Sequence, residues 1–210
     1  MPVTNLFETK SLQFAGFLSY RDICVPSGVS NFLTGESGSG KSSLLRLFNA
    51  THSPTAGEIF YLGRDISEIP ALELRRKVLL VSQDVYLFPA TIWQNVTRFC
   101  AYRGVSVPSQ ETFTRFAQMC RLELPFDYDC LQMSGGEKQR LFLAIHLFFC
   151  PETILLDEPT SSLDNETAFA LLENVTAFCR EQGINMLAVS HSPDIVEKFA
   201  ENVTHLGEKI

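Results

Sequence analysis

The most informative part of this sequence is the stretch Gly35-Glu36-Ser37-Gly38-Ser39-Gly40-Lys41-Ser42. It matches the pattern GxxxxGK[ST] in full, follows the apolar run 29–33, and leads into a segment with helical spacing at 43–50. Glycines let backbone N–H groups curve around a phosphate, while the helix dipole and Lys41 offset its charge. The hydroxyl of Ser42 is suited to ligating Mg²⁺. Together with Ser43, which follows it, this stretch predicts a site for the phosphates of a nucleotide.

The composition indicates one folded domain. The chain has 210 residues, of which 45% are hydrophobic and 20% charged, enough to bury a core. Its 17 basic and 24 acidic residues give a net charge of −7, whereas nucleic-acid-binding domains are normally basic. Nucleic acid is therefore not an expected partner. A phosphate ligand remains compatible with this charge, because a helix N-terminus and one lysine hold a phosphate locally.

The cysteine pattern and the hydropathy predict a cytoplasmic chain. No two cysteines form a CxxC pair, which disfavours a zinc site and a disulfide scaffold. The first residues lack the basic segment and apolar run of a secretory signal. The longest apolar stretch, 141–150, falls well short of the ~20 residues that span a bilayer. We therefore expect reduced thiols and a chain that does not itself cross a membrane.

Apolar segments of strand length alternate with helical patterns along the chain. The expected strands lie at 29–33, 59–62, 78–81, 153–156 and 186–189, and the expected helices at 43–50, 137–149 and 166–181. Short strands are expected in 1–33, and residues 84–130 are helical and rich in aromatic side chains. This alternation indicates a largely parallel sheet covered by helices on both faces.

Two carboxylates end the apolar strand at 153–156. The ends of parallel strands open onto the ligand crevice of such a sheet, so Asp157 and Glu158 are expected to face the phosphates. In this position Asp157 would hold Mg²⁺, and Glu158 would act as the general base that polarises the attacking water.

A third motif points to a particular protein family. It reads Met133-Ser134-Gly135-Gly136-Glu137-Lys138-Gln139-Arg140, and it resembles the signature sequence of ATP-binding cassette (ABC) ATPases, usually LSGGQ. Met replaces Leu here, and Glu replaces Gln. Ser134 is also a good helix N-cap. An N-cap does not by itself explain the two glycines that follow, which let the backbone approach an anion closely.

The other landmarks of the family follow in order. Gln83 resembles the Q-loop glutamine, which contacts Mg²⁺ and the attacking water, and His191 resembles the switch histidine, which contacts the γ-phosphate. Ser162-Leu163-Asp164 resembles the D-loop, which crosses the dimer interface. ABC cassettes usually stack the adenine on an aromatic residue of the N-terminal strands; Phe14 is the predicted residue here, with Phe17 as the alternative.

The resemblance implies an α/β fold of the P-loop NTPase (ABC ATPase) type. It has a mostly parallel sheet core, a small N-terminal antiparallel β subdomain and a helical subdomain. One domain would cover 1–210, with residues 1–83 and 151–210 as catalytic core and 84–150 as helical subdomain. The implied nucleotide contacts are Phe14, Gly35, Glu36, Ser37, Gly38, Ser39, Gly40, Lys41, Ser42, Ser43, Ser134, Gly135, Gly136 and Asp164. Glu158, His191 and Gln83 would be catalytic, and Ser42, Gln83 and Asp157 would hold Mg²⁺.

The implied function is that of a transporter ATPase subunit. Two copies would dimerise head to tail around two Mg-ATP and energise a separate permease from the inner face of the cell membrane. The segments 81–84 and 87–96 resemble exporter-type cassettes, and the short chain resembles small bacterial cassettes, among them an iron-export group. A soluble ABC ATPase of repair, translation or cluster assembly is the alternative. A P-loop kinase is disfavoured, because it needs no signature sequence.

The same resemblance implies a groove for a permease helix beside the Q-loop. We expect Tyr86, Phe88 and Trp93 to be exposed there, and Phe113 and Phe116 to pack the core of the helical region.

Overall fold

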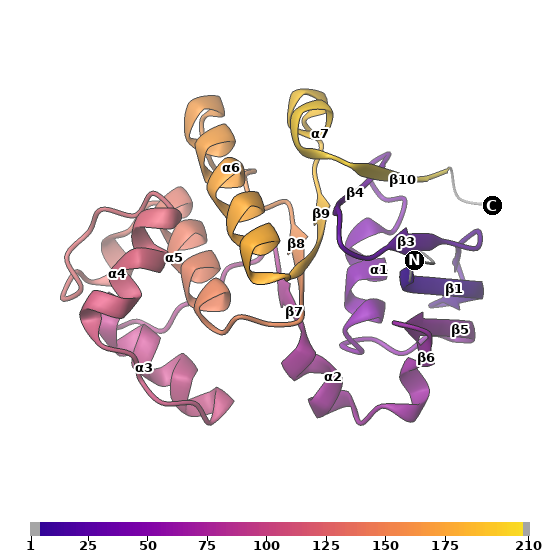
Figure 1. Ribbon diagram of the computed structural model, residues 1–210, viewed down its shortest axis with the longest axis horizontal. Coiled ribbons are helices and arrows are strands. Elements are labelled where there is room, and N and C mark those ends of the chain that lie inside the picture. The colour runs from indigo at the N-terminus through magenta and orange to yellow at the C-terminus, as the bar shows by residue number, and fades with distance from the viewer. Residues whose placement is uncertain (1–4, 208–210) are drawn as a thin grey trace.

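The computed structural model of the protein describes residues 5–207. A parallel sheet lies in the middle of the molecule, an antiparallel sheet lies at one end, and a group of helices lies at the other (Figure 1). These helices are α3 (Ile92–Arg103), α4 (Gln110–Met119) and α5 (Gly135–Phe148). This arrangement confirms the predicted α/β architecture.

The parallel sheet brings the motif-bearing segments together. Its strand order is β10-β4-β9-β8-β7. The strands are β4 (Ser30–Gly35), β7 (Val78–Val81), β8 (Thr153–Asp157), β9 (Asn185–Val189) and β10 (Asn202–Leu206). Every pairing is parallel, and β8 is buried along its whole length. The segments that follow β4, β7, β8 and β9 therefore leave the sheet at the same edge.

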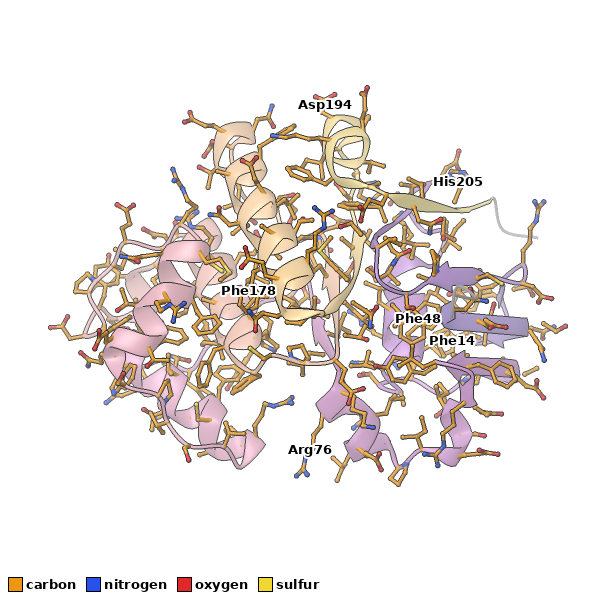
Figure 2. The ribbon with its side chains drawn as sticks, in the orientation of Figure 1. Phe14, Phe48, Arg76, Phe178, Asp194 and His205 are labelled. Atoms are coloured by element: carbon orange, nitrogen blue, oxygen red, sulfur yellow. The ribbon has the colours of Figure 1, made fainter. Side chains whose placement is uncertain are left out.

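The antiparallel sheet covers one side of α1 (Lys41–Phe48). Its strands are β1 (Asn5–Phe14), β2 (Leu18–Ser19), β3 (Cys24–Pro26), β5 (Ala56–Tyr61) and β6 (Arg64–Asp65), all paired antiparallel. Phe48 points from α1 toward this sheet (Figure 2), where its ring stacks on Phe7 with centroids 4.2 Å apart. Both rings are fully buried, so the helix that starts at the glycine-rich loop is anchored between the two sheets.

The helices at the other end pack through aromatic side chains. Phe113 of α4 is fully buried, and Phe116 and Met119 pack against the same core, as their helical spacing predicts. The ring of Phe116 lies 5.7 Å from that of Phe178 in α6 (Asn165–Gln182), the helix that joins this group to the sheet (Figures 1 and 2). This core therefore continues beneath α6 to the parallel strands.

Several short elements were not predicted from the sequence. They are α2 (Ala71–Lys77), α7 (Pro193–Phe199), strand β10, and the 3-10 turns Ile66–Glu68 and Cys130–Gln132. Helices of seven residues contain fewer than two full turns, too few for a helical period to stand out. The strand expected at 59–62 exists as β5, where it pairs with β1 in the antiparallel sheet.

Within residues 5–207, no helix combines the length and the apolar character that crossing a bilayer requires. All six cysteines are free thiols, and only Cys24 and Cys150 are exposed.

Candidate nucleotide-binding and hydrolysis site

The loop between β4 and α1 has a backbone that only glycine adopts readily. The φ angles of Gly35, Gly38 and Gly40 are 146°, 79° and 93°. A Cβ on Gly35 would lie 2.6 Å from the carbonyl oxygen of Leu206, and one on Gly40 would lie 2.6 Å from Tyr20 Oη. Gly40 is the N-cap of α1 and makes no side-chain cap. The first N–H groups of α1 are therefore oriented by backbone alone, as in an anion-binding helix start.

Lys41 folds back over this loop. Its side chain is 5% exposed, and Nζ donates to the carbonyl oxygens of Gly35 at 2.9 Å and Glu36 at 2.7 Å. Burial lowers the pKa of the Lys41 ammonium, and the carboxylates of Glu158 and Asp157 oppose that shift. The cation is thus held against the backbone of the loop.

Ser42 and Asp157 form an oxygen-rich pair beside the lysine. Ser42 Oγ donates to Asp157 Oδ1 at 3.0 Å, and Asp157 is 2% exposed. Burial raises the pKa of the Asp157 carboxyl, while the hydrogen bond from Ser42 lowers it. A divalent cation would favour the ionised form. Hydroxyl, carboxylate and amide oxygens are the ligands that Mg²⁺ prefers, so Ser42, Asp157 and the nearby Gln83 fit this ion.

Glu158 is held at the same edge of the sheet by two other predicted residues. Gln83 Nε2 donates to Glu158 Oε2 at 3.2 Å, and His191 Nε2 lies 3.0 Å from Glu158 Oε1. These residues follow β7, β8 and β9. The structure therefore brings one carboxylate, one amide and one imidazole together directly across from the loop.

A cavity of about 310 Å³ joins these groups. Its lining consists of Phe17, Leu18, Ser37, Gly38, Gly40, Lys41, Ser42, Ser43, Gln83, Glu158 and His191. Three residues of the loop lie outside this lining. Gly35 ends β4, Glu36 borders a separate hollow, and the hydroxyl of Ser39 is buried with no hydrogen-bond partner among residues 5–207.

The two candidate residues for adenine stacking lie in different places. Phe14 stacks on His52, with ring centroids 5.1 Å apart and planes 20° apart, at the antiparallel sheet (Figure 2). It does not line the cavity, whereas Phe17 does and is 63% exposed. The turn after Phe14 carries the chain toward the loop, so the residue at the turn, and not the one at the strand end, reaches the cavity.

The signature turn forms a second, separate part of the site. Ser134 is the N-cap of α5: its Oγ accepts from the N–H of Glu137 at 3.3 Å, and Glu137 Oε2 accepts from the N–H and Oγ of Ser134, both at 2.8 Å. These hydrogen bonds lower the pKa of the Glu137 carboxyl. Ser134, Gly135 and Gly136 are not among the residues that line the cavity of the loop.

The D-loop lies directly against this turn. A Cβ on Gly136 would lie 2.9 Å from Leu163 Cδ2 and 3.0 Å from the carbonyl oxygen of Ser162. Asp164, which follows, caps α6 by accepting from the N–H of Thr167 at 2.9 Å. The turn and the D-loop therefore form one surface of the chain.

Two contacts of the site were missed in the sequence. Tyr20 Oη donates to the carbonyl oxygen of Gly40 at 3.0 Å, and burial raises the pKa of Tyr20 to about 12. Gln139 Nε2 donates to the carbonyl oxygen of Glu158 at 2.9 Å. Gln139 belongs to the signature motif, but a helical pattern does not tell which backbone group a buried amide reaches. No local signal marks Tyr20.

Of the three aromatic residues predicted to be exposed, Tyr86 is exposed, whereas Phe88 and Trp93 are half-buried. Trp93 packs against the core of the helical region, with its ring 5.6 Å from Phe126 and 6.5 Å from Phe113, so the predicted exposure is wrong for Trp93 as it is for Phe88. Tyr86 and Tyr102 are 61% and 79% exposed. Both contact the half-buried Phe88, at 5.1 and 5.9 Å between ring centroids. Tyr86, Phe88 and Tyr102 are called the surface aromatic cluster below.

The loop, the strand-end carboxylates and their position at the edge of a parallel sheet define a P-loop nucleotide-binding cassette. The family model described as ABC transporter matches residues 19–161, more than half of the chain. The chain belongs to the ABC transporter family.

Two relatives show how much of the chain this similarity covers. The chain is 33% identical over 186 residues to the methionine import ATP-binding protein MetN 1 of Listeria monocytogenes serotype 4b (strain F2365), covering 86% of this chain and 55% of the relative. It is 32% identical over 200 residues to the probable iron export ATP-binding protein FetA of Escherichia coli (strain K12), covering 92% of this chain and 88% of the relative. The chain thus spans little more than half the length of the methionine import proteins that it matches.

Solved cassettes have the same fold. The chain is 25% identical to a bacterial Atm1-family ABC exporter with ATP bound, with a TM-score of 0.85 over 98% of this chain and 38% of the exporter. It is 25% identical to the ATP-binding cassette MJ0796 in a dimeric, post-hydrolysis state bound to ADP and Pi, with a TM-score of 0.80 over 95% of this chain and 94% of the cassette.

Proposed function

We propose that the chain is the ATP-binding and ATP-hydrolysing subunit of an ABC transporter. The observation that carries this proposal is the arrangement of Glu158, whose carboxylate lies between Gln83 and His191 and opens onto the cavity of the glycine-rich loop. A carboxylate in this position can accept a proton from water next to a terminal phosphate. The ADP and Pi bound to the related dimeric cassette are the products of that reaction.

The polar residues of the cavity, together with Phe17 and the neighbouring Asp157, have defined parts in this proposal. The N–H groups of the loop and Lys41 bind the phosphates, and Phe17 supports the adenine. Ser42, Asp157 and Gln83 hold Mg²⁺, which neutralises charge on the phosphate oxygens when it is bound. Glu158 accepts the proton of the attacking water on its carboxylate. His191 fixes that carboxylate from one side and Gln83 from the other.

The separation of the signature turn from the cavity favours a homodimer. Ser134, Gly135 and Gly136 offer a helix N-terminus to an anion, yet they do not line the cavity of their own chain. In a head-to-tail dimer the turn of one copy covers the nucleotide of the other, and two ATP molecules lie between the copies. A two-fold dimer closes both sites at once.

We further propose that a separate permease docks on the surface aromatic cluster, which places the subunit on the inner face of the membrane. Aromatic residues and arginine are enriched at docking surfaces, and here Arg98 lies over the ring of the half-buried Phe88, 5.1 Å from its centroid, between the exposed Tyr86 and Tyr102 in the same cluster. Co-purification of a permease should be weakened by Phe88→Ala, with the melting temperature of the isolated subunit as the control.

The test of the ATPase proposal is Glu158→Gln. The amide does not accept the proton, so the variant should bind Mg-ATP but turn it over at least about 100-fold more slowly. It should also accumulate as an ATP-bound dimer in size-exclusion chromatography. Glu152→Gln is the matched control, because Glu152 lies at the opposite end of β8 and is exposed. A Glu158→Gln variant with full turnover would remove Glu158 as the base.

A further inference from the structure

The backbone of Glu158 has a conformation that its own residue type disfavours. Its φ is +51°, in the left-handed region that side chains with a Cβ rarely adopt. Such a conformation persists only where its surroundings hold it. The N–H of Glu158 donates to the carbonyl oxygen of Val189 at 3.2 Å, and its carbonyl oxygen accepts from the N–H of Ser161 at 3.2 Å. The third contact is the hydrogen bond from Gln139 to the same carbonyl, at 2.9 Å.

Among these three contacts, only the one from Gln139 is made by a side chain. Gln139 lies near the start of α5, is 3% exposed, and reaches across to the end of β8. Its Oε1 is buried and has no hydrogen-bond partner within the described part of the chain. A buried amide whose nitrogen is hydrogen-bonded and whose oxygen is not lowers the stability of the fold. The hydrogen bond to Glu158 is thus the contact that the Gln139 side chain makes within the described residues.

The same end of α5 touches the loop after Glu158 at a second point. Gly136 packs so closely on Leu163 and Ser162 that a Cβ there would lie within 3.0 Å of both. A shift of the start of α5 relative to β8 thus acts on the segment 158–163 in two places. Only one of these contacts, the bond from Gln139, is made to Glu158 itself.

We propose that Gln139 is a positioning residue for hydrolysis: it holds the backbone of Glu158 in the left-handed conformation that aims the carboxylate at Gln83 and His191. Because Gln139 lies on the helix that the signature turn begins, the aim of the base depends on where that turn sits. This inference rests on the proposed ATPase function. It adds that the signature helix acts on the base of its own chain, in addition to covering the nucleotide of the other copy.

Three substitutions in the full chain test this role. Gln139→Met keeps the size and removes the donor, Gln139→Glu replaces the donor with an acceptor, and Gln139→His keeps a ring N–H at a similar reach. The Met and Glu variants should lower kcat by about 10-fold to 100-fold, the scale on which misplacing a catalytic group acts. KM and the affinity for a fluorescent ATP analogue should stay within about twofold, since none of the phosphate contacts changes. The His variant should recover most of kcat.

Controls separate this role from general loss of stability. Val175→Ala removes fully buried methyl groups in α6, so it lowers the melting temperature and should leave kcat unchanged. ATP-dependent dimerisation should persist when Gln139→Met is combined with Glu158→Gln. Unchanged kcat in the Met and Glu variants, a parallel loss of ATP affinity, or a His variant no better than Met would each overturn the positioning role. If the unaltered chain does not hydrolyse ATP, the proposed function fails first, and the inference fails with it.

Discussion

The loop before α1 and the turn before α5 are both glycine-rich starts of helices, yet they are built in different ways. At the loop, Gly38 and Gly40 have positive φ, and the N-cap Gly40 makes no side-chain cap. At the turn, Gly135 and Gly136 are helical, and Ser134 and Glu137 cap the helix reciprocally. The first helix start depends on backbone conformations that only glycine adopts readily. The second is an ordinary capped helix start whose first two residues are small.

This difference indicates that the loop and the turn have different roles in nucleotide binding. The loop adds a buried lysine and a magnesium-type ligand set to its N–H groups, so it has what phosphate binding requires within one chain. At the turn, the neighbouring cation is Arg140, whose guanidinium lies 3.4 Å from a Cβ built on Gly136, and the donors of Ser134 are already engaged by the Glu137 carboxylate. We infer that the loop binds ATP by itself, while the turn contributes only when a second copy brings a nucleotide to it.

The largest expected effect comes from Lys41→Ala. This substitution removes the buried cation of the loop before α1. A charge-assisted hydrogen bond contributes roughly 1.5–3 kcal/mol, so loss of the contacts to phosphate should weaken ATP binding about 100-fold or more. Equilibrium titration with a fluorescent ATP analogue measures it. Lys10→Ala is the control, since Lys10 lies over the Phe60 ring and away from the cavity. Unchanged affinity in Lys41→Ala would show that the loop is not the nucleotide site.

A paired substitution tests the backbone difference directly. Gly40→Ala puts a Cβ at a φ of 93° and 2.6 Å from Tyr20 Oη, so it should destabilise the fold by about 1–3 kcal/mol and weaken ATP binding. Gly135→Ala meets nothing closer than Ser162 Oγ at 4.0 Å and lies in a helix, so the stability should be unchanged or slightly raised. Urea unfolding of both variants gives the comparison. Equal losses at the two positions would contradict the distinction between them.

The smallest expected effect concerns the charge of Glu137 at the turn. Glu137→Gln removes a carboxylate that faces the anion expected there, so in a Glu158→Gln background ATP-dependent dimerisation should need about twofold to fivefold less ATP. An unchanged ATP requirement for dimerisation would mean that the Glu137 charge plays no part at the turn.

The same variant has a defined pH dependence. Hydrogen bonds from Ser134 lower the pKa of Glu137 in the fold, so the charged form stabilises the fold at neutral pH. That contribution, about 1 kcal/mol or less, is lost as the pH falls below the ordinary value of 4.5. Thermal melts of the chain and the variant should therefore converge between pH 5 and pH 3, on the order of two pH units. A difference in melting temperature that grows as the pH falls would contradict this pH dependence.

Much of the site was predictable from the sequence, because its residues directly follow the ends of parallel strands. Parallel strands carry Gln83, Glu158 and His191 to one edge of the sheet, and apolar runs mark those strands in the sequence. The loop was predictable for the same reason, since its pattern fixes a strand, a turn and a helix in order.

The rest depended on tertiary contacts that no local pattern encodes. Phe14 and Phe17 are equally aromatic, and only the turn between β1 and β2 decides that Phe17 faces the cavity. Trp93 follows the Q-loop closely, yet its helix turns it toward Phe113 and Phe126. The contact of Gln139 with Glu158 joins two segments whose pairing is set by the packing of α5 on the sheet.

The central claim is that a working site combines the loop of one copy with the signature turn of another. Mixing two inactive variants tests it directly. Lys41→Ala disables the loop, and Ser134→Arg blocks the turn while its own loop still binds ATP. In a mixed dimer one site pairs both defects and the other pairs an intact loop with an intact turn. Neither variant alone should hydrolyse ATP, and an equimolar mixture should recover up to about a quarter of the activity of the unaltered chain. No recovery on mixing, or full activity of Ser134→Arg alone, would contradict the account.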